Sequence, residues 1–143
     1  MNPEREIRNM ATKVFINLPV KDLNRSKLFF EDIGFHFNPQ FTDANVTCMM
    51  ISNGIYVMLL TEPYFQSFTD KKISDARKAT EVLITLDAGS KEEISTLVNK
   101  AKSLGAMVYR KPVDHGWMYQ HSFADLDGHQ WEFTYIDETQ LPC

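Results

Sequence analysis

One carboxylate near the end of the chain is placed where it could do chemistry. Glu132 lies four residues after Gly128 of an Asp-Gly turn, between the large apolar residues Trp131 and Phe133 of the strand-like run QWEFTYI. An acid among apolar neighbours is costly unless it has a partner. Glu132 is therefore a candidate metal ligand or general base, and the alternative is a structural residue bonded to the backbone or to Asn17.

A second acid, Glu81, begins another alternating run, EVLITLD. If Glu81 and Glu132 face one cavity, they could share a cation. Without a cation, repulsion and desolvation would raise the pKa of at least one of them, which would create an acid–base pair. The alternative for Glu81 is an exposed residue at the start of a strand.

The histidines form no metal-binding constellation, because their spacing matches no zinc motif. His121, in the run MYQHSF, shares its strand parity with Trp117 and Tyr119 and could reach a pocket with them. A hydrogen-bonded strand histidine is the alternative. His129 and His115 lie in turn-like contexts, where we expect them to be solvated.

Composition limits the classes of partner. The chain has 143 residues, 43% hydrophobic and 24% charged, with a formal net charge of −4, which suits one domain and argues against a nucleic-acid partner. No apolar run approaches the ~20 residues of a membrane span, and the start lacks the apolar region of a secretory signal. We therefore expect a cytoplasmic protein.

The two halves of the chain repeat one order of elements. Residues 13–20 alternate as a strand, and Asp22 can cap the helix that follows. Residues 81–87 alternate in the same way, and Ser90 with Glu93 forms a capping box before a second helix. Extended segments and a turn follow each helix, at Asn53-Gly54 and at Asp127-Gly128. The pattern predicts an α+β fold of two βαβββ modules that form a concave mixed sheet.

This repeat also predicts the boundaries of the modules. They are a flexible N-terminal extension (1–12), the first module (13–62), a linker or lid (63–79), the second module (80–137) and a C-terminal tail (138–143).

Alternation along each strand predicts which side chains face the concave surface. Trp131, Phe133 and Tyr135 belong to the face that packs on the helices. The opposite, inward set is Phe15, Asn17, Tyr56, Met58, Leu60, Glu81, Leu83, Thr85, Gln130, Glu132 and Thr134.

The paired modules, together with the motifs LPVKDLNRSKLFFEDIGF and DLDGHQWEF, resemble the vicinal oxygen chelate superfamily. That superfamily includes glyoxalase I, extradiol dioxygenases, fosfomycin-resistance enzymes and bleomycin-resistance proteins. The resemblance covers roughly residues 13–136. It implies the fold and a homodimer, whereas one fold hosts many reactions.

Metal-dependent members of this family bind a divalent ion through four equivalent strand positions. The resemblance assigns these positions to Phe15, Met58, Glu81 and Glu132. Phenylalanine cannot bind a metal and a thioether is a poor ligand for a hard ion. Asn17, two residues after Phe15, could replace the lost donor and complete an oxygen-only site suited to Mg²⁺ or Mn²⁺.

Two functions therefore remain open, and no cofactor is certain. One is metal-free binding of a small molecule, as the resemblance to bleomycin-resistance proteins implies. The other is a glyoxalase-type lyase or isomerase that uses Glu81 and Glu132 with one divalent metal, Mg²⁺, Mn²⁺, Ni²⁺ or Zn²⁺. An extradiol dioxygenase is disfavoured because its set of two histidines and one carboxylate is absent. The candidate substrate-binding residues are Asn17, Phe15, Met58, Tyr56, His121, Tyr119 and Trp117.

Overall fold

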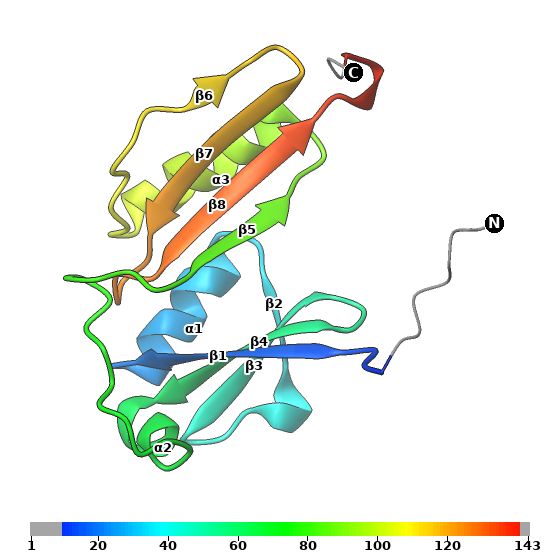
Figure 1. Cartoon of the computed structure of the whole chain (residues 1–143). Coiled ribbons are helices and arrows are strands. Elements are labelled where there is room, and N and C mark those ends of the chain that lie inside the picture. Colours follow the sequence, from blue (N-terminus) through cyan, green and yellow to red (C-terminus); the bar gives the residue numbers. More distant parts are fainter. Residues whose placement is uncertain (1–9, 141–143) are drawn as a thin grey trace.

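Each half of the chain forms one four-stranded mixed sheet with a helix on one face (Figure 1). The computed structural model describes residues 10–140. Residues 1–9 of the predicted N-terminal extension and residues 141–143 of the predicted tail lie outside the described residues.

The first sheet, called sheet A, has the strand order β1-β4-β3-β2. β1 runs parallel to β4, and the other pairs are antiparallel. In chain order its elements are β1 (Val14–Val20), α1 (Leu23–Asp32), β2 (His36–Asn38), the 3₁₀ turn η1 (Pro39–Phe41), β3 (Val46–Ser52) and β4 (Ile55–Thr61).

The second sheet, called sheet B, repeats this topology with the order β5-β8-β7-β6 and a parallel β5–β8 pair. Its elements are β5 (Leu83–Asp87), α3 (Lys91–Ser103), β6 (Val113–Asp114), β7 (Met118–Ala124), β8 (Gln130–Ile136) and the 3₁₀ turn η2 (Glu138–Gln140). The predicted α+β fold of two βαβββ modules is thus confirmed.

The helices begin where their capping residues predict. The Asp22 side chain accepts a hydrogen bond from the Arg25 backbone N–H at 3.0 Å, which satisfies a free donor in the first turn of α1. Ser90 accepts from the Glu93 N–H at 3.0 Å, and the Glu93 carboxylate reaches back to the Gly89 N–H at 3.2 Å. Ser90 thus caps α3 as the predicted capping box requires, whereas Glu93 accepts from the residue before the cap and not from the Ser90 N–H.

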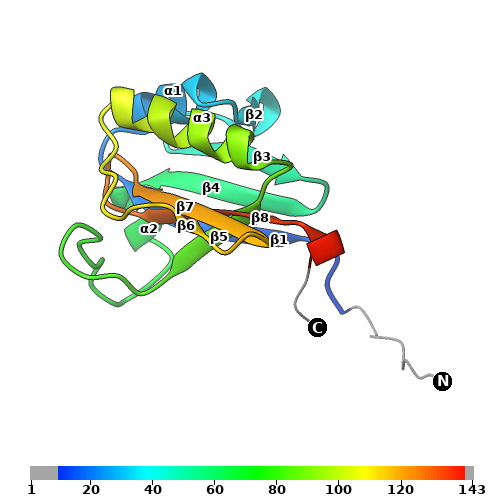
Figure 2. The same ribbon diagram turned by 90° about the horizontal axis from the view of Figure 1, so that it is seen from above.

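Both helices lie on the same side of the two sheets, and the core fills the space between them (Figure 2). The fully buried Trp131 of β8 belongs to the second module, yet its ring lies 5.1 Å from that of Phe30 on α1. Phe29 of α1 likewise lies 5.9 Å from Phe123 of β7. The two modules therefore share one core through their aromatic side chains.

Between the sheets the chain forms α2 (Glu62–Gln66) and then an irregular stretch to the start of β5. We call residues 67–82 the linker. Arg77 holds it to the second module, because its guanidinium donates to the Leu126 carbonyl at 2.7 Å. Within residues 10–140, no helix is long and apolar enough to cross a membrane.

Candidate functional site

The face of each sheet that points away from α1 and α3 carries most of the predicted inward residues, and we call it the open face. On sheet A, Leu18 and Val57 are buried on the helix side, so Phe15 and Tyr56 point to the open face. Their rings stack at 5.1 Å with an interplanar angle of 16°, although Phe15 is 53% exposed. Tyr56 is half-buried, and an exposed aromatic ring such as that of Phe15 on a sheet face can contribute to a binding surface.

Asn17 and Met58 continue this surface as the next pair in the β1–β4 register. Met58 is half-buried and Asn17 is exposed. Between β1 and β4 the open face of sheet A thus carries apolar and aromatic side chains beside the Asn17 amide, and the register places His36 and Asn38 of β2 on the same face.

On sheet B the open face carries Glu132, as alternation predicts. Its partners are Thr85, whose hydroxyl donates to Oε1 at 2.8 Å, and Gln120, whose amide donates to the same oxygen at 3.3 Å. Neither is the predicted partner, Asn17. Oε1 is satisfied by these donors, and Oε2 has no hydrogen bond to any residue in the described part of the chain. Glu132 is therefore held in place with one oxygen free for a ligand.

Glu81 does not occupy the strand position that the resemblance assigned to it. β5 begins at Leu83, and Glu81 lies in an exposed bend two residues earlier. The register shows which residue is equivalent to Phe15. Phe15 precedes Asn17, the partner of Met58, by two residues, and Leu83 precedes Thr85, the partner of Glu132, by two residues. Leu83 therefore takes the place of Phe15 in the second module.

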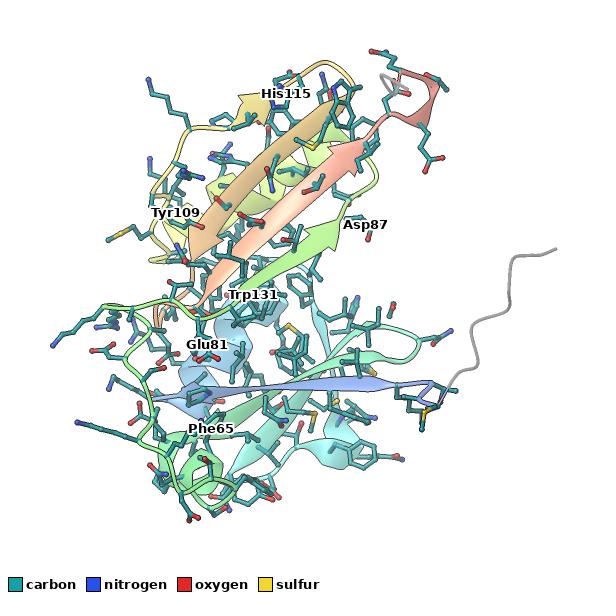
Figure 3. All side chains as sticks on the ribbon, in the orientation of Figure 1. Phe65, Glu81, Asp87, Tyr109, His115 and Trp131 are labelled. Carbon is teal, nitrogen blue, oxygen red and sulfur yellow. The ribbon has the colours of Figure 1, made fainter. Side chains whose placement is uncertain are left out.

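The two predicted acids are also far apart along the strands. Extending the β5–β8 register places Glu81 level with Gly128, four positions before Glu132, which corresponds to about 13 Å. Glu81 instead lines a cavity of about 240 Å³ with Asn17 beneath the linker. Figure 3 shows Glu81 on the segment between the two sheets.

The donor set does not fit a chelated divalent ion. Within residues 10–140, no three His, Cys, Asp or Glu side chains lie close enough to hold one. The positions equivalent to the family's ligands are Phe15, Met58, Leu83 and Glu132, of which one can bind a hard cation.

Tyr119 and His121 lie on the other face of sheet B from Glu132. Ser122 is the cross-strand neighbour of Glu132 and shares its face. Tyr119 and His121 alternate with Ser122 along β7, so both point toward α3. The Tyr119 hydroxyl lies 3.4 Å from that of Ser95 on α3, and His121 Nε2 donates to the Arg110 carbonyl at 3.1 Å. These residues do not join the open face.

Trp117 lies just before β7 and stacks on His115 at 6.3 Å, at the far end of the sheet. The register of β7 therefore separates Tyr119 and His121 from Glu132, and Trp117 lies outside that strand.

The turn before Glu132 is built around a buried acid that the sequence did not single out. Asp125 is 7% exposed, and its carboxylate accepts from the Trp131 indole N–H at 3.0 Å and from the Asp127 and His129 backbone N–H groups at 2.9 and 3.0 Å. Burial raises the pKa of Asp125, while the nearby His129 and these donors oppose that shift.

The same turn fastens the second module to the first. Asp127 accepts from the Lys21 backbone N–H at 2.9 Å and from the Ser26 hydroxyl at 3.1 Å. His129 Nε2 donates to the Pro19 carbonyl at 2.7 Å. The expectation that this histidine is solvated was therefore wrong. The motifs LPVKDLNRS and DLDGHQWEF thus contact each other. We call these bonds the module latch, and a spacing of about 106 residues hides them from local sequence reasoning.

Comparisons with known proteins agree with this architecture. The model of the bleomycin resistance protein-like N-terminal family matches residues 12–52. A hypothetical protein from S. aureus is 30% identical in sequence, with a TM-score of 0.76 over 90% of this chain and 96% of that one. A search of curated proteins finds no match.

More distant structures share the fold. A glyoxalase/bleomycin resistance protein/dioxygenase family enzyme from Burkholderia phytofirmans PsJN is 15% identical, with a TM-score of 0.73 over 85% of this chain and 96% of that one. A genomically encoded fosfomycin resistance protein from Listeria monocytogenes is 21% identical, with a TM-score of 0.64 over 95% of this chain and 100% of that one. The chain belongs to the vicinal oxygen chelate superfamily.

Proposed function

We propose that this protein binds a small organic molecule on its open face without a metal ion. The observation that supports this most directly is the stack of the exposed Phe15 on the half-buried Tyr56, since the resemblance places a metal ligand at the position of Phe15. Leu83, 51% exposed, extends the apolar character to the equivalent place on sheet B. Three of the four ligand positions are thus suited to apolar contact and not to coordination.

The chemistry of the surface defines the kind of ligand. A stacked aromatic pair offers a flat apolar platform for a planar group. The free Oε2 of Glu132 can accept a hydrogen bond or pair with a positive charge. The proposed ligand therefore combines a planar apolar part with a cationic or donor group, and bleomycin, which the matched family's description names, is the first compound to test.

We also propose that a homodimer encloses this surface. The open faces of both sheets look to the side opposite α1 and α3 (Figure 2). A second copy placed there would bury Phe15 and Leu83 and convert an open surface into a cavity, which strengthens apolar contact with a ligand. Sedimentation of the purified protein would reveal the dimer.

Calorimetric titration of metal-stripped protein with bleomycin tests the binding proposal. We expect binding in the absence of metal, weakened about tenfold in Phe15→Ala because stacking and apolar burial together contribute roughly 1.5 kcal/mol. Leu28→Ala is the matched control, since Leu28 is 49% exposed but lies on α1, away from the open face. Equal binding by Phe15→Ala and wild type would contradict the site. Stoichiometric binding of Mn²⁺ or Ni²⁺ that disappears in Glu132→Gln would contradict metal independence.

A further inference from the structure

A second cavity, of about 530 Å³, lies away from Phe15, Met58 and Glu132, at the end of sheet B where the linker crosses the β7–β8 turn. Its walls come from the first turn of α1, the linker at 76–80, the stretch after α3 at 105–109, and the chain around the β7–β8 turn. Its volume is in the range of about 300–1,000 Å³ that small-molecule sites occupy.

Positive charge gathers around this cavity in a chain whose net charge is −4. Arg25, Arg77 and Lys78 line it, and all three are exposed. None of them forms an ion pair with an acid of residues 10–140. Asp125 is the acid in the lining, and both of its oxygens already accept hydrogen bonds from the turn and from Trp131.

The linker cations are carried on an ordered turn. The Asp75 carboxylate accepts from the Arg77 backbone N–H at 3.0 Å, and the Asp75 carbonyl accepts from the N–H groups of Lys78 and Ala79, each at 3.0 Å. The turn also packs closely on Gly128, where an added Cβ would lie 2.7 Å from the Arg77 nitrogen. This close approach requires glycine and fixes the turn that carries Arg77 and Lys78, which line the same cavity as Arg25.

The rest of the cavity lining provides an apolar wall and a hydrogen-bond donor. Tyr109 is half-buried and Met107 is 66% exposed, which gives the cavity an apolar wall. Figure 3 shows Tyr109 at the edge of sheet B opposite Asp87, far from β5. The Gln130 side-chain oxygen accepts from the Thr80 hydroxyl at 2.6 Å, so the amide nitrogen of Gln130 is oriented as a donor.

We propose that this cavity is a second binding site, specific for a small organic anion. A carboxylate or phosphate monoester contacts Arg25, Arg77 and Lys78, and the apolar or aromatic part of the same molecule lies against Tyr109 and Met107. The lining includes none of Phe15, Met58 and Glu132, so failure of this proposal would leave the proposed function intact.

Titration calorimetry with simple probes tests this assignment on the full chain. Phenyl phosphate and benzoate carry both the anion and the ring, inorganic phosphate carries the anion alone, and benzyl alcohol carries the ring alone. We expect phenyl phosphate or benzoate to bind more tightly than either partial probe, and binding to weaken as salt is raised because exposed charges are screened. Which of the two binds better distinguishes a phosphate ester from a carboxylate as the natural group.

Variants locate the binding. Arg25→Gln and Lys78→Gln each remove a charge whose side chain makes no hydrogen bond within residues 10–140, so the fold should be retained. Loss of one charged hydrogen bond should weaken phenyl phosphate or benzoate binding about tenfold. Lys72→Gln, an exposed lysine of the same linker outside the cavity, should bind as wild type does. Absence of binding at millimolar probe, or equal binding by all four proteins, would overturn the proposal.

Discussion

Replacing Asp127 by alanine should destabilise the protein by separating its two modules. The substitution removes both latch bonds of this carboxylate, to the Lys21 N–H and to the Ser26 hydroxyl. The Lys21 N–H is exposed and can donate to water instead, so loss of this hydrogen bond costs little free energy. Ser26 is 4% exposed, so its hydroxyl would stay buried without this acceptor. A bond to a charged group and the penalty for a buried unsatisfied one together give about 2–3 kcal/mol.

The assay is equilibrium unfolding in urea, followed by circular dichroism and by tryptophan fluorescence in parallel. For a chain of this size the loss corresponds to a decrease in Tm of roughly 6–10 °C. Asp127→Asn should recover part of the stability, because its side-chain oxygen can still accept from the buried Ser26 hydroxyl. Asp70→Ala, an exposed linker acid without a hydrogen bond in the described chain, is the control. If Asp127→Ala unfolds within 0.5 kcal/mol of wild type, in line with ordinary surface substitutions, the latch does not join the modules as we infer.

Two further predictions concern the same turn. Burial raises the pKa of Asp125, so the folded protein holds this proton more tightly than the unfolded chain; its contribution to stability is largest below the ordinary value of 3.8 and declines as the pH rises toward the raised value. Unfolding free energies measured across that interval should therefore fall more steeply with pH for wild type than for Asp125→Asn, and identical slopes would show that Asp125 does not titrate in this way. Gly128→Ala should displace the linker, because the new Cβ would lie 2.7 Å from the Arg77 nitrogen at a φ of +95°. Trypsin should then cleave the linker faster than in Gly116→Ala, which has a similar φ of +83° and no atom within 4 Å; equal rates would mean that the linker does not depend on this contact.

Several features of the fold were readable from local sequence. Asp22 and Ser90 begin the helices because a side-chain oxygen can satisfy a free N–H in the first turn, and this needs only a few neighbouring residues. Alternation correctly assigned Trp131 and Phe133 to the buried face and Glu132 to the other, because side chains of a strand point to opposite faces in turn.

The extent and pairing of strands were less accessible. The alternating run begins at Glu81, two residues before the hydrogen-bonded strand β5 begins. Alternation alone therefore made Glu81 a strand residue. Pairing with β8 decides where the strand starts. It makes Leu83, and not Glu81, the residue of the second module that is equivalent to Phe15. The same applies to β7, since its pairing with β8 decides that Tyr119 and His121 face α3.

By itself, then, the sequence determined the order of elements, the repeat of two modules and the face of each strand, because each depends on residue type and short spacing. The resemblance to the family implied in addition that Phe15 and Met58 stand at its ligand positions. Only the tertiary structure decided that Glu132, and not Glu81, lies on the open face, that Asp127 and His129 join the modules, and that Arg25 lines one cavity with Arg77 and Lys78. These contacts link residues about 50 to 110 positions apart. Their partners are set by strand register and by packing of the shared aromatic core, and no local pattern encodes them.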